Sequence, residues 1–435
     1  MKKILLFIIP TLFLAGIARA EVSAETAFVL NTFLFIFGGI LVMFMALGFA
    51  MLEAGFVRKK NTSAILLKNI ALYSIAGIMF YFVGYSLMYV DVSGWIGSLG
   101  GMFYNPSSDE LALLDGADNV AAITDTGYSV ASDWFFQMVF CATAVSIVSG
   151  ACAERIKVWP FMIFAAIMTG IIYPIYGSWT WGGGWLAEMG FSDFAGSTIV
   201  HSVGGWAALV GCFILGPRSG KYGKDGKITP IAGANMPLAA LGTFILWFGW
   251  FGFNGGSQLA LGSALDAVAI SIVVVNTNMA ACGGVVAAII LSQLMFKKID
   301  LSIALNGAIA GLVAITAGPD LTNHFTSMII GAIGGILCTV AIPMLDKMKI
   351  DDVVGAISAH LVAGIWGTLA VGIFGGGDFI VQFIGIFAAG VLVVPLSAVG
   401  FFILKGTVGL RVSEETEAVG LDKAELTTIA YPEFN

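Results

Sequence analysis

Two of the three histidines in the sequence occupy the same position in a repeated motif. Segments 193–205 and 352–364 both read Asp-x2-Gly-x4-His-x-Val-x-Gly, so that His201 and His360 are equivalent. A neutral imidazole carries one hydrogen-bond donor and one acceptor, and histidine titrates near neutral pH. Two imidazoles in contact could therefore hold a shared proton and relay it. The alternative is a pair of core histidines that only join two helices by a hydrogen bond.

The composition restricts where such a pair can lie. Of the 435 residues, 58% are hydrophobic and only 11% are charged, whereas a soluble protein has about 25% charged residues. This excludes a soluble enzyme, a nucleic-acid-binding protein and a disordered protein. The apolar runs are long and unbroken, unlike the alternating strands of a membrane β-barrel. We therefore expect an all-α, polytopic membrane protein that is no enzyme, binds no nucleic acid and uses no cofactor or metal.

Eleven segments have the length of a transmembrane helix, about 20 apolar residues. They are 27–55, 63–90, 132–153, 158–177, 194–216, 234–253, 266–293, 301–317, 327–344, 353–374 and 379–404. All 20 lysines and arginines fall in residues 1–20, in or near the loops after odd-numbered spans, or in the tail. Since basic loops stay in the cytoplasm, the N-terminus is expected outside and the C-terminus inside. The expected location is the inner (plasma) membrane.

The chain divides into three parts. Residues 1–20 are typical of a cleaved secretory signal, with Lys2 and Lys3 before an apolar run and Ala18-Arg19-Ala20 as the cleavage site. An uncleaved first span is the alternative, although the run is short for a bilayer crossing. Residues 21–405 are expected to form the transmembrane domain, and residues 406–435 a polar cytoplasmic tail.

A second match extends the repeat beyond the histidines. Residues 48–55 read Gly-x4-Glu-x-Gly and residues 249–256 read Gly-x4-Asn-x-Gly, which aligns Glu53 with Asn254. These segments lie in spans 1 and 6, and the histidines lie in spans 5 and 10. An odd offset of five spans inverts one copy, so we expect a 5+5 inverted repeat plus one extra helix. Such repeats place a site near the midplane, where ionisable groups usually line a pathway, which favours a functional histidine pair.

Longer motifs surround these residues. They are Phe136-Gln137-x2-Phe140, Ala153-Glu154-Arg155, Trp181-Gly-Gly-Gly184, Asp193-Phe-Ala-Gly-Ser-Thr-Ile-Val-His201, Gly216-Pro-Arg218 and Trp250-Phe-Gly-Phe253-Asn254-x2-Ser257. Together they resemble the Amt/Mep/Rh family of ammonium transporters, and within it the Amt branch, over residues 25–425. The resemblance implies ammonium or ammonia as the transported species and a homotrimer with one hydrophobic pore per subunit. It also implies that a PII nitrogen-regulatory protein docks at the cytoplasmic face.

The resemblance assigns roles to individual residues. It implies an outer vestibule that recruits ammonium through Trp181, Phe140 and Ser257. The buried Asp193 would support this site without touching the ion. The rings that close the pore would be Phe140 and Phe253. The proton relay at the pore centre would be His201 and His360. The pore supports would be Trp250, Gln137 and Asn254.

The residue types fit these roles on physical grounds. Aromatic faces attract cations, and tryptophan does so best, although an interfacial aromatic belt is the alternative for Trp181. Asp193 can equally cap the helix that it begins. A pore lined by rings offers no oxygens to a cation, and a charge at the bilayer centre costs at least about 3 kcal/mol. Ammonium can lose its proton under that desolvation, whereas potassium cannot.

Glu53 departs from the familiar bacterial members of this family. They have tyrosine in a Phe-Tyr-Gly-Gly stretch, where this chain has Leu52-Glu53-Ala54-Gly55. Near the inner end of the first span, Glu53 could accept a proton or favour a cation beside the histidines. Alternatively, helix-end N–H groups or the neighbourhood of Asn254 satisfy its carboxylate. The sequence leaves both roles open.

Two other functions would use the same residues. An ammonium sensor would keep the outer site but conduct little, and a gas channel of the Rh branch would pass neutral ammonia. A sensor usually carries an appended signalling domain, which residues 406–435 do not resemble. The motifs that begin at Asp193 and Trp181 favour the Amt branch over the Rh branch.

Overall fold

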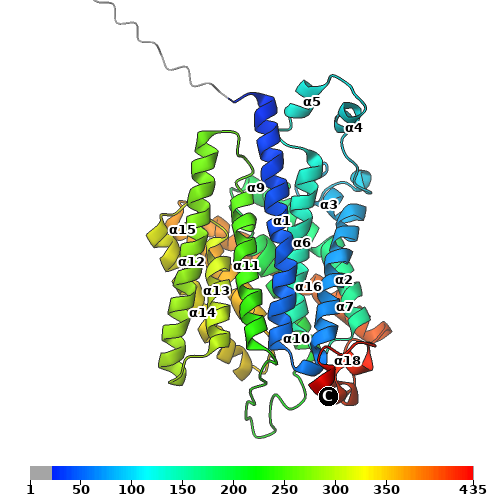
Figure 1. Cartoon of the computed structure of the whole chain (residues 1–435), viewed down its shortest axis with the longest axis vertical. Helices are drawn as coiled ribbons and strands as arrows, with labels where there is room; N and C mark the ends of the chain where they lie inside the picture. The colour runs from blue at the N-terminus through cyan, green and yellow to red at the C-terminus, as the bar shows by residue number, and fades with distance from the viewer. Residues whose placement is uncertain (1–21, 435) are drawn as a thin grey trace, which may run out of the picture.

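The computed structural model describes residues 22–434, so the predicted signal segment, 1–20, lies outside the described residues. The described residues form α-helices, short 3-10 and π-helical turns and loops, and contain no β-strand. One end of the bundle carries α4 (Ser108–Leu114), α5 (Val120–Thr124) and α9 (Trp185–Glu188), and the opposite end carries the C-terminus (Figure 1). We call these ends the vestibule face and the C-terminal face.

Each expected span overlaps a helical stretch. The long helices and their parts are α1 (Ala24–Phe56), α2 (Thr62–Met79), α3 (Tyr85–Tyr89), α6 (Val130–Ala151), α7 (Val158–Ile167), α8 (Tyr173–Thr180), α10 (Val203–Leu215), α11 (Met236–Gly256), α12 (Ala264–Phe296), α13 (Leu301–Ile315), α14 (His324–Lys347), α15 (Ala363–Phe374) and α16 (Phe379–Thr407). Among the described residues, ten helical stretches are long and apolar enough to cross a membrane, and α13 is a shorter apolar helix of 15 residues. The all-α fold is thus confirmed, while eleven crossings and their orientation stay predictions.

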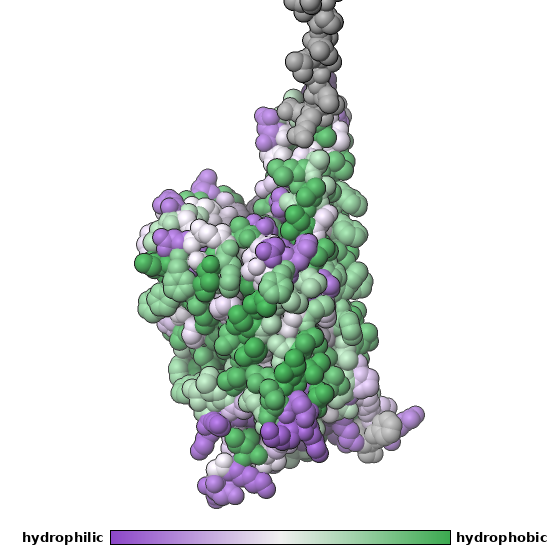
Figure 2. Space-filling view, turned by 90° about the vertical axis from the view of Figure 1, so that its left-hand side faces the viewer, coloured by the Kyte–Doolittle hydropathy of each residue, from purple (hydrophilic) through white to green (hydrophobic). Residues whose placement is uncertain are grey.

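The flank of the bundle is apolar. Figure 2 shows a broad hydrophobic zone along the side of the molecule, with hydrophilic side chains gathered beneath it at the C-terminal face. Large apolar side chains are exposed on several of the long helices, among them Phe213 of α10, Phe244 of α11 and Phe387 of α16. Such a surface would be unstable in water and suits the hydrocarbon of a bilayer.

Helices α1 and α11, which contain the equivalent segments 48–55 and 249–256, lie side by side (Figure 1). Glycines permit their close approach. A Cβ added at Gly55 would lie 2.4 Å from the backbone nitrogen of Ala239, and one added at Gly249 would lie 2.3 Å from Cγ of Met45. Small residues let helix backbones meet where no hydrophobic effect drives the helices together. The repeated glycines therefore fix how the two halves of the bundle meet.

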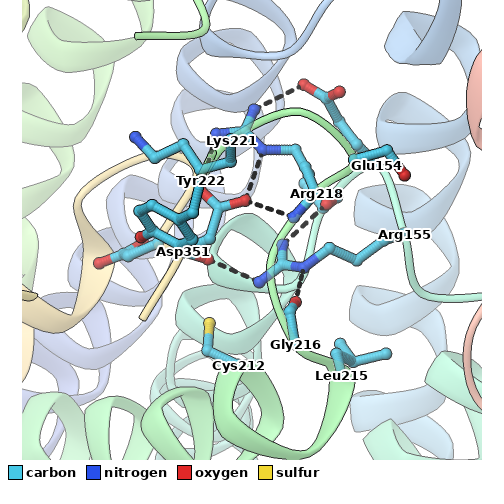
Figure 3. Close-up of polar contacts among 12 residues, drawn as sticks. Glu154, Arg155, Cys212, Leu215, Gly216, Arg218, Lys221, Tyr222 and Asp351 are labelled. Carbon is cyan, nitrogen blue, oxygen red and sulfur yellow. Dashed lines mark hydrogen bonds and ion pairs between the residues drawn. The ribbon is translucent and has the colours of Figure 1, made fainter. Parts of the chain in front are cut away.

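Arg218 is the centre of a buried ion network on the C-terminal face (Figure 3). Its Nε and Nη2 donate to the two carboxylate oxygens of Asp351 at 2.8 and 2.9 Å, and its Nη1 donates to Glu154 Oε1 at 3.0 Å. Glu154 also pairs with Arg58. Arg155 Nη2 donates to the Asp351 carbonyl at 2.6 Å. The network joins the loops that follow α1, α6, α10 and α14.

The C-terminal tail is docked beside this network. Glu417, in α17 (Glu414–Val419), accepts a hydrogen bond from the Ser219 N–H at 2.7 Å. Asp422, in α18 (Leu421–Ala424), accepts the N–H groups of Ser63 and Ala64 at 3.0 and 2.9 Å. These N–H groups belong to the first turn of α2, where a carboxylate satisfies otherwise unpaired donors. The tail therefore caps a long helix of the bundle.

The network gives a first prediction for Asp351→Asn. The variant should lose about 3–5 kcal/mol of stability, because Glu154 must then balance Arg218 in addition to Arg58. Burial raises the pKa of Asp351, but hydrogen bonds from Arg218 and the charges of Arg155 and Arg218 outweigh burial, so the pKa lies below its usual range. The stabilisation is therefore complete above the unfolded pKa of about 4 and is lost as the pH falls through the folded pKa.

Thermal melting of the detergent-purified protein checks this prediction. The difference between wild type and Asp351→Asn should be constant above about pH 5 and should shrink below about pH 4. Asp225→Asn, at an exposed carboxylate of the loop after α10, is the matched control and should melt like wild type. An equal melting temperature for Asp351→Asn at pH 7 would contradict the account.

Candidate functional site

A cavity of about 380 Å³ lies at the vestibule face. Four residues predicted from the sequence line it, namely Phe140, Trp181, Ser257 and Gln137. The rings of Trp181 and Phe140 stand at 79°, with centroids 5.8 Å apart. Ser257 Oγ donates to the Phe253 carbonyl at 2.8 Å, which leaves its lone pairs free to accept. Ring faces beside a hydrogen-bond acceptor suit a small cation that carries N–H groups.

Two stacked phenylalanines close the inner side of this cavity. The centroids of Phe140 and Phe253 are 4.0 Å apart with 27° between the ring planes, and both rings are buried. The His201 ring lies behind Phe253, with centroids 5.4 Å apart. The pair predicted to close the pore therefore separates the cavity from the histidines.

The two histidines are in direct contact, as the repeat predicts. Their Nδ1 atoms are 3.2 Å apart, and His201 and His360 are 0% and 3% exposed. At this distance one Nδ1 must donate and the other must accept. Trp250 stacks against His201 at 4.9 Å, and Phe49, its equivalent in the repeat, lies 5.9 Å from His360. Within the described residues, Nε2 of His201 is buried and has no hydrogen-bond partner.

Each histidine lies in a π-helical turn, η5 (Ser197–Ser202) or η6 (Ile357–Val362). Such turns recur at functional sites, since they displace side chains from the regular helical position. A carboxylate holds each turn. Asp193 accepts the backbone N–H groups of residues 196–199, and Asp352 accepts those of residues 355–357. The expected capping role of Asp193 is confirmed, and Asp352 has the same role in the second segment of the repeat.

Asp193 also links this turn to the vestibule. Its carbonyl accepts the Trp181 indole N–H at 3.0 Å. Burial raises the pKa of Asp193 to about 6, while the four backbone hydrogen bonds act against burial. Both carboxylate oxygens are occupied by N–H groups of the turn, so Asp193 positions Trp181 rather than facing the cavity.

Beyond His360, a cavity of about 10 Å³ is lined by Glu53, Phe49, Asn306 and Val354, among others. Asn306 and Val354 also line a larger cavity, of about 360 Å³, at the C-terminal face. The vestibule, the phenylalanine pair, the histidine pair and these two cavities therefore follow one another through the bundle. Together they form a discontinuous path from the vestibule face to the C-terminal face.

Glu53 is fully buried beside this path. Its Oε2 accepts Asn69 Nδ2 at 2.8 Å and Ser149 Oγ at 3.0 Å, while its Oε1 has no partner within residues 22–434. Lys68 lies nearby, with Nζ donating to the Ser149 carbonyl at 3.2 Å. The sequence left two roles open for Glu53, and its hydrogen bonds in the described residues come from Asn69 and Ser149 rather than from helix-end N–H groups or the neighbourhood of Asn254. Its side chain is held by α2 and α6 of its own half.

The remaining pore supports have clear partners. Asn254 Nδ2 donates to Thr277 Oγ1 at 2.9 Å, so Asn254 bonds to the helix that follows it, as Glu53 does to α2. Trp250 Nε1 donates to Thr316 Oγ1 at 2.8 Å. Gln137 lines the vestibule and donates to Asp133 at 3.3 Å. Gln137 is thus part of the vestibule rather than of the passage behind it.

The structure adds vestibule residues that the sequence reasoning missed. Asp133 lines the cavity, and so do three tyrosines, Tyr85, Tyr89 and Tyr128. Asp133, Gln137 and Phe140 stand at positions i, i+4 and i+7 of α6 and therefore share one face of that helix. This spacing, together with an acidic residue inside an apolar span, is the sequence signal that could have identified Asp133 as a vestibule residue.

The comparisons with known proteins agree on one family. The model of the Ammonium Transporter Family matches residues 32–431. Ammonium transporter Amt2 of Archaeoglobus fulgidus is 41% identical, and the match covers 91% of this chain and 87% of the relative. A putative ammonium transporter of Synechocystis is 40% identical, with 94% of this chain and 92% of the relative covered.

Solved structures are similar as well. A structure named "Sensor Amt Protein" has a TM-score of 0.84 and 39% sequence identity, with 93% of this chain and 100% of that chain covered. Candida albicans Mep2 has a TM-score of 0.80 and 26% identity, with 95% and 94% covered. Since the family model and close relatives span nearly the whole sequence, the chain belongs to the ammonium transporter family.

Proposed function

We propose that the protein conducts ammonium across the inner (plasma) membrane, with the vestibule face outside and the C-terminal face in the cytoplasm. One observation carries the proposal. The buried contact of His201 with His360, 3.2 Å between Nδ1 atoms, lies behind the stacked rings of Phe140 and Phe253. A passage that excludes water and contains titratable groups suits a substrate that forms hydrogen bonds but enters the passage uncharged.

Recruitment takes place in the vestibule. Ammonium rests against the rings of Trp181 and Phe140 and donates an N–H to Ser257 Oγ. A cation over aromatic faces gains about 0.5–2 kcal/mol, depending on how far it is desolvated. The bond from the Trp181 indole to the Asp193 carbonyl supports this step, because it fixes the orientation of the ring.

Deprotonation follows at the phenylalanine pair. Behind Phe140 and Phe253 the passage is lined by rings, and burial in such a place lowers the pKa of an amine by up to a few units. Ammonium divides into ammonia, which enters, and a proton. Potassium has no proton to lose and stays with its water shell. Selectivity therefore comes from acid–base chemistry rather than from ion size.

The released proton travels through the histidines. The unpartnered Nε2 of His201 accepts it, and the Nδ1–Nδ1 contact hands a proton to His360. The free Oε1 of Glu53, which lines the next cavity, accepts it in turn. Each ammonium thus yields one ammonia and one proton, which recombine at the C-terminal face.

The proposal includes the protein's setting. It is a homotrimer, and its segment 1–20 is a signal peptide that is removed. The tail, residues 406–435, offers a docking surface to a PII nitrogen-regulatory protein. Membership of the ammonium transporter family and the apolar flank support these statements.

A second candidate function is ammonium sensing with little flux. The observation that favours it is the similarity, at 39% identity, to the structure named "Sensor Amt Protein". Both functions need the vestibule, but only transport needs an open route past the histidines. Binding of ammonium without any current in sealed liposomes would favour the sensor.

The histidine relay predicts the behaviour of His201→Ala. In proteoliposomes, an ammonium jump should give a current at least about tenfold smaller than wild type, or a current that potassium jumps now also produce. The reason is that the variant removes the proton acceptor behind the phenylalanine pair. His324→Ala is the matched control, because that histidine is exposed at the start of α14. A selective, full-sized ammonium current in His201→Ala would overturn the relay.

Glu53→Gln tests the exit of the proton. The amide keeps the shape of the side chain and its bonds to α2 and α6 but cannot take up a proton. We expect the ammonium current to fall by about tenfold or more while binding at the vestibule is unchanged. Glu414→Gln, in the exposed part of the tail, is the control. Equal currents in Glu53→Gln and wild type would show that Glu53 is structural.

A further inference from the structure

Asp133 places a carboxylate in the wall of the vestibule. The residue is only 8% exposed, and it lines the cavity together with Gln137 and Tyr89. Its Oδ2 accepts the Tyr85 hydroxyl at 3.1 Å, and its Oδ1 accepts Gln137 Nε2 at 3.3 Å. Both neighbours are neutral, so they orient the carboxylate without neutralising its charge.

The carboxylate is not used to cap its helix. Asp133 lies in the first turn of α6, where an acidic residue often stabilises the helix N-terminus. Here Glu110 performs that task, with Oε1 accepting the Val130 N–H at 2.9 Å. The hydrogen bonds of the Asp133 carboxylate within the described chain come from side chains, those of Tyr85 and Gln137.

Among the described residues, no lysine, arginine or histidine forms an ion pair with this carboxylate. The sequence has no lysine or arginine between residues 69 and 154 or between residues 158 and 217, the segments that supply most of the cavity wall. A buried carboxylate without a charged partner is costly, so a cation that enters the cavity would be stabilised there.

Unsatisfied acceptors surround the same point. Gln137 Oε1 and the Tyr89 hydroxyl are buried and lack a hydrogen-bond partner within the part of the chain that the structure describes. Gln137 is itself 8% exposed, and its Nε2 is turned to Asp133, which leaves Oε1 as a pure acceptor. These groups, together with the Asp133 carboxylate, would stabilise a ligand that is positively charged and donates several hydrogen bonds. Ammonium has four N–H donors in a tetrahedral arrangement.

We propose that Asp133, Gln137 and Tyr89 form a cation-binding site for ammonium and methylammonium in the vestibule, beside the ring site of Trp181. Asp133 is its anionic ligand, and the two acceptors take further N–H groups. The site rests on the proposed function, since it names how that transport collects its substrate. It raises the local concentration of the cation and hands it to Trp181, which lines the same cavity.

Equilibrium binding of radiolabelled methylammonium to the purified protein tests the site without relying on transport. Asp133→Asn should raise the dissociation constant by about tenfold or more, because it removes one charge from a partly buried site. Asp133→Glu keeps the charge and should bind within about threefold of wild type. Asp125→Asn, at an exposed carboxylate of the loop before α6, is the control for general surface charge and should bind like wild type.

Ammonium-jump currents in proteoliposomes give a second readout. In Asp133→Asn the concentration for half-maximal current should rise by about tenfold while the maximal current stays within about twofold. Size-exclusion elution and the melting temperature confirm that the variant is folded. If Asp133→Asn does not fold, Asp133→Ser carries the test, since it also removes the charge and should raise the dissociation constant by about tenfold or more.

The outcomes separate this site from the transport proposal. Weaker binding in Asp133→Asn alone supports the site, even if the wild type gives no current and the transport proposal fails. Wild-type affinity in Asp133→Asn overturns the site, even if ammonium currents are normal. A tenfold loss of affinity in Asp133→Glu would also overturn it, because the loss would then follow packing rather than charge.

Discussion

The cost of moving a charge into a dry passage governs the whole arrangement. Between the vestibule and the cavity at the C-terminal face, the path narrows to the rings of Phe140, Phe253 and the two histidines. Rings supply no oxygen ligands, so a bare cation there would lose its hydration without compensation. A molecule that can leave its proton behind meets no such barrier. The proposed selectivity for ammonium therefore depends on the loss of a proton and not on the size of the ion.

The fold meets that constraint by symmetry. The two repeated segments each contribute a histidine in a π-helical turn, an aspartate that holds the turn and a ring against the imidazole. Glycines at the contact of α1 and α11 bring the halves together. The repeated segments 48–55 and 249–256 differ at one position that matters for charge. The first has Glu53 there and the second has Asn254. The position near the vestibule face is thereby neutral, and the equivalent position near the C-terminal face carries an acid.

The sequence predicted those parts of the site that the repeat contains. His201 and His360 are the clearest case, because an inverted repeat must bring equivalent residues together, and the structure places them in contact. The capping by Asp193 and Asp352 followed from helix chemistry. The aromatic vestibule depended on family resemblance, since an interfacial belt has the same composition.

Two features could not be predicted. The partners of Glu53 come from α2 and α6, and their side-chain directions depend on packing that no motif encodes. Asp133 resembles an ordinary acidic residue in the first turn of a helix. Its place in the vestibule depends on α3, which follows the π-helical turn Phe80–Gly84 and brings Tyr85 and Tyr89 to the cavity.

The most direct test of the central claim is a paired measurement on the wild-type protein in sealed liposomes. Transient current and internal pH are recorded together after equal jumps of ammonium, potassium and sodium. The account predicts a current with ammonium alone, without the internal alkalinisation that uncharged ammonia would cause. A potassium current of similar size would contradict selectivity by deprotonation. Alkalinisation without current would contradict the proton relay and indicate a channel for neutral ammonia.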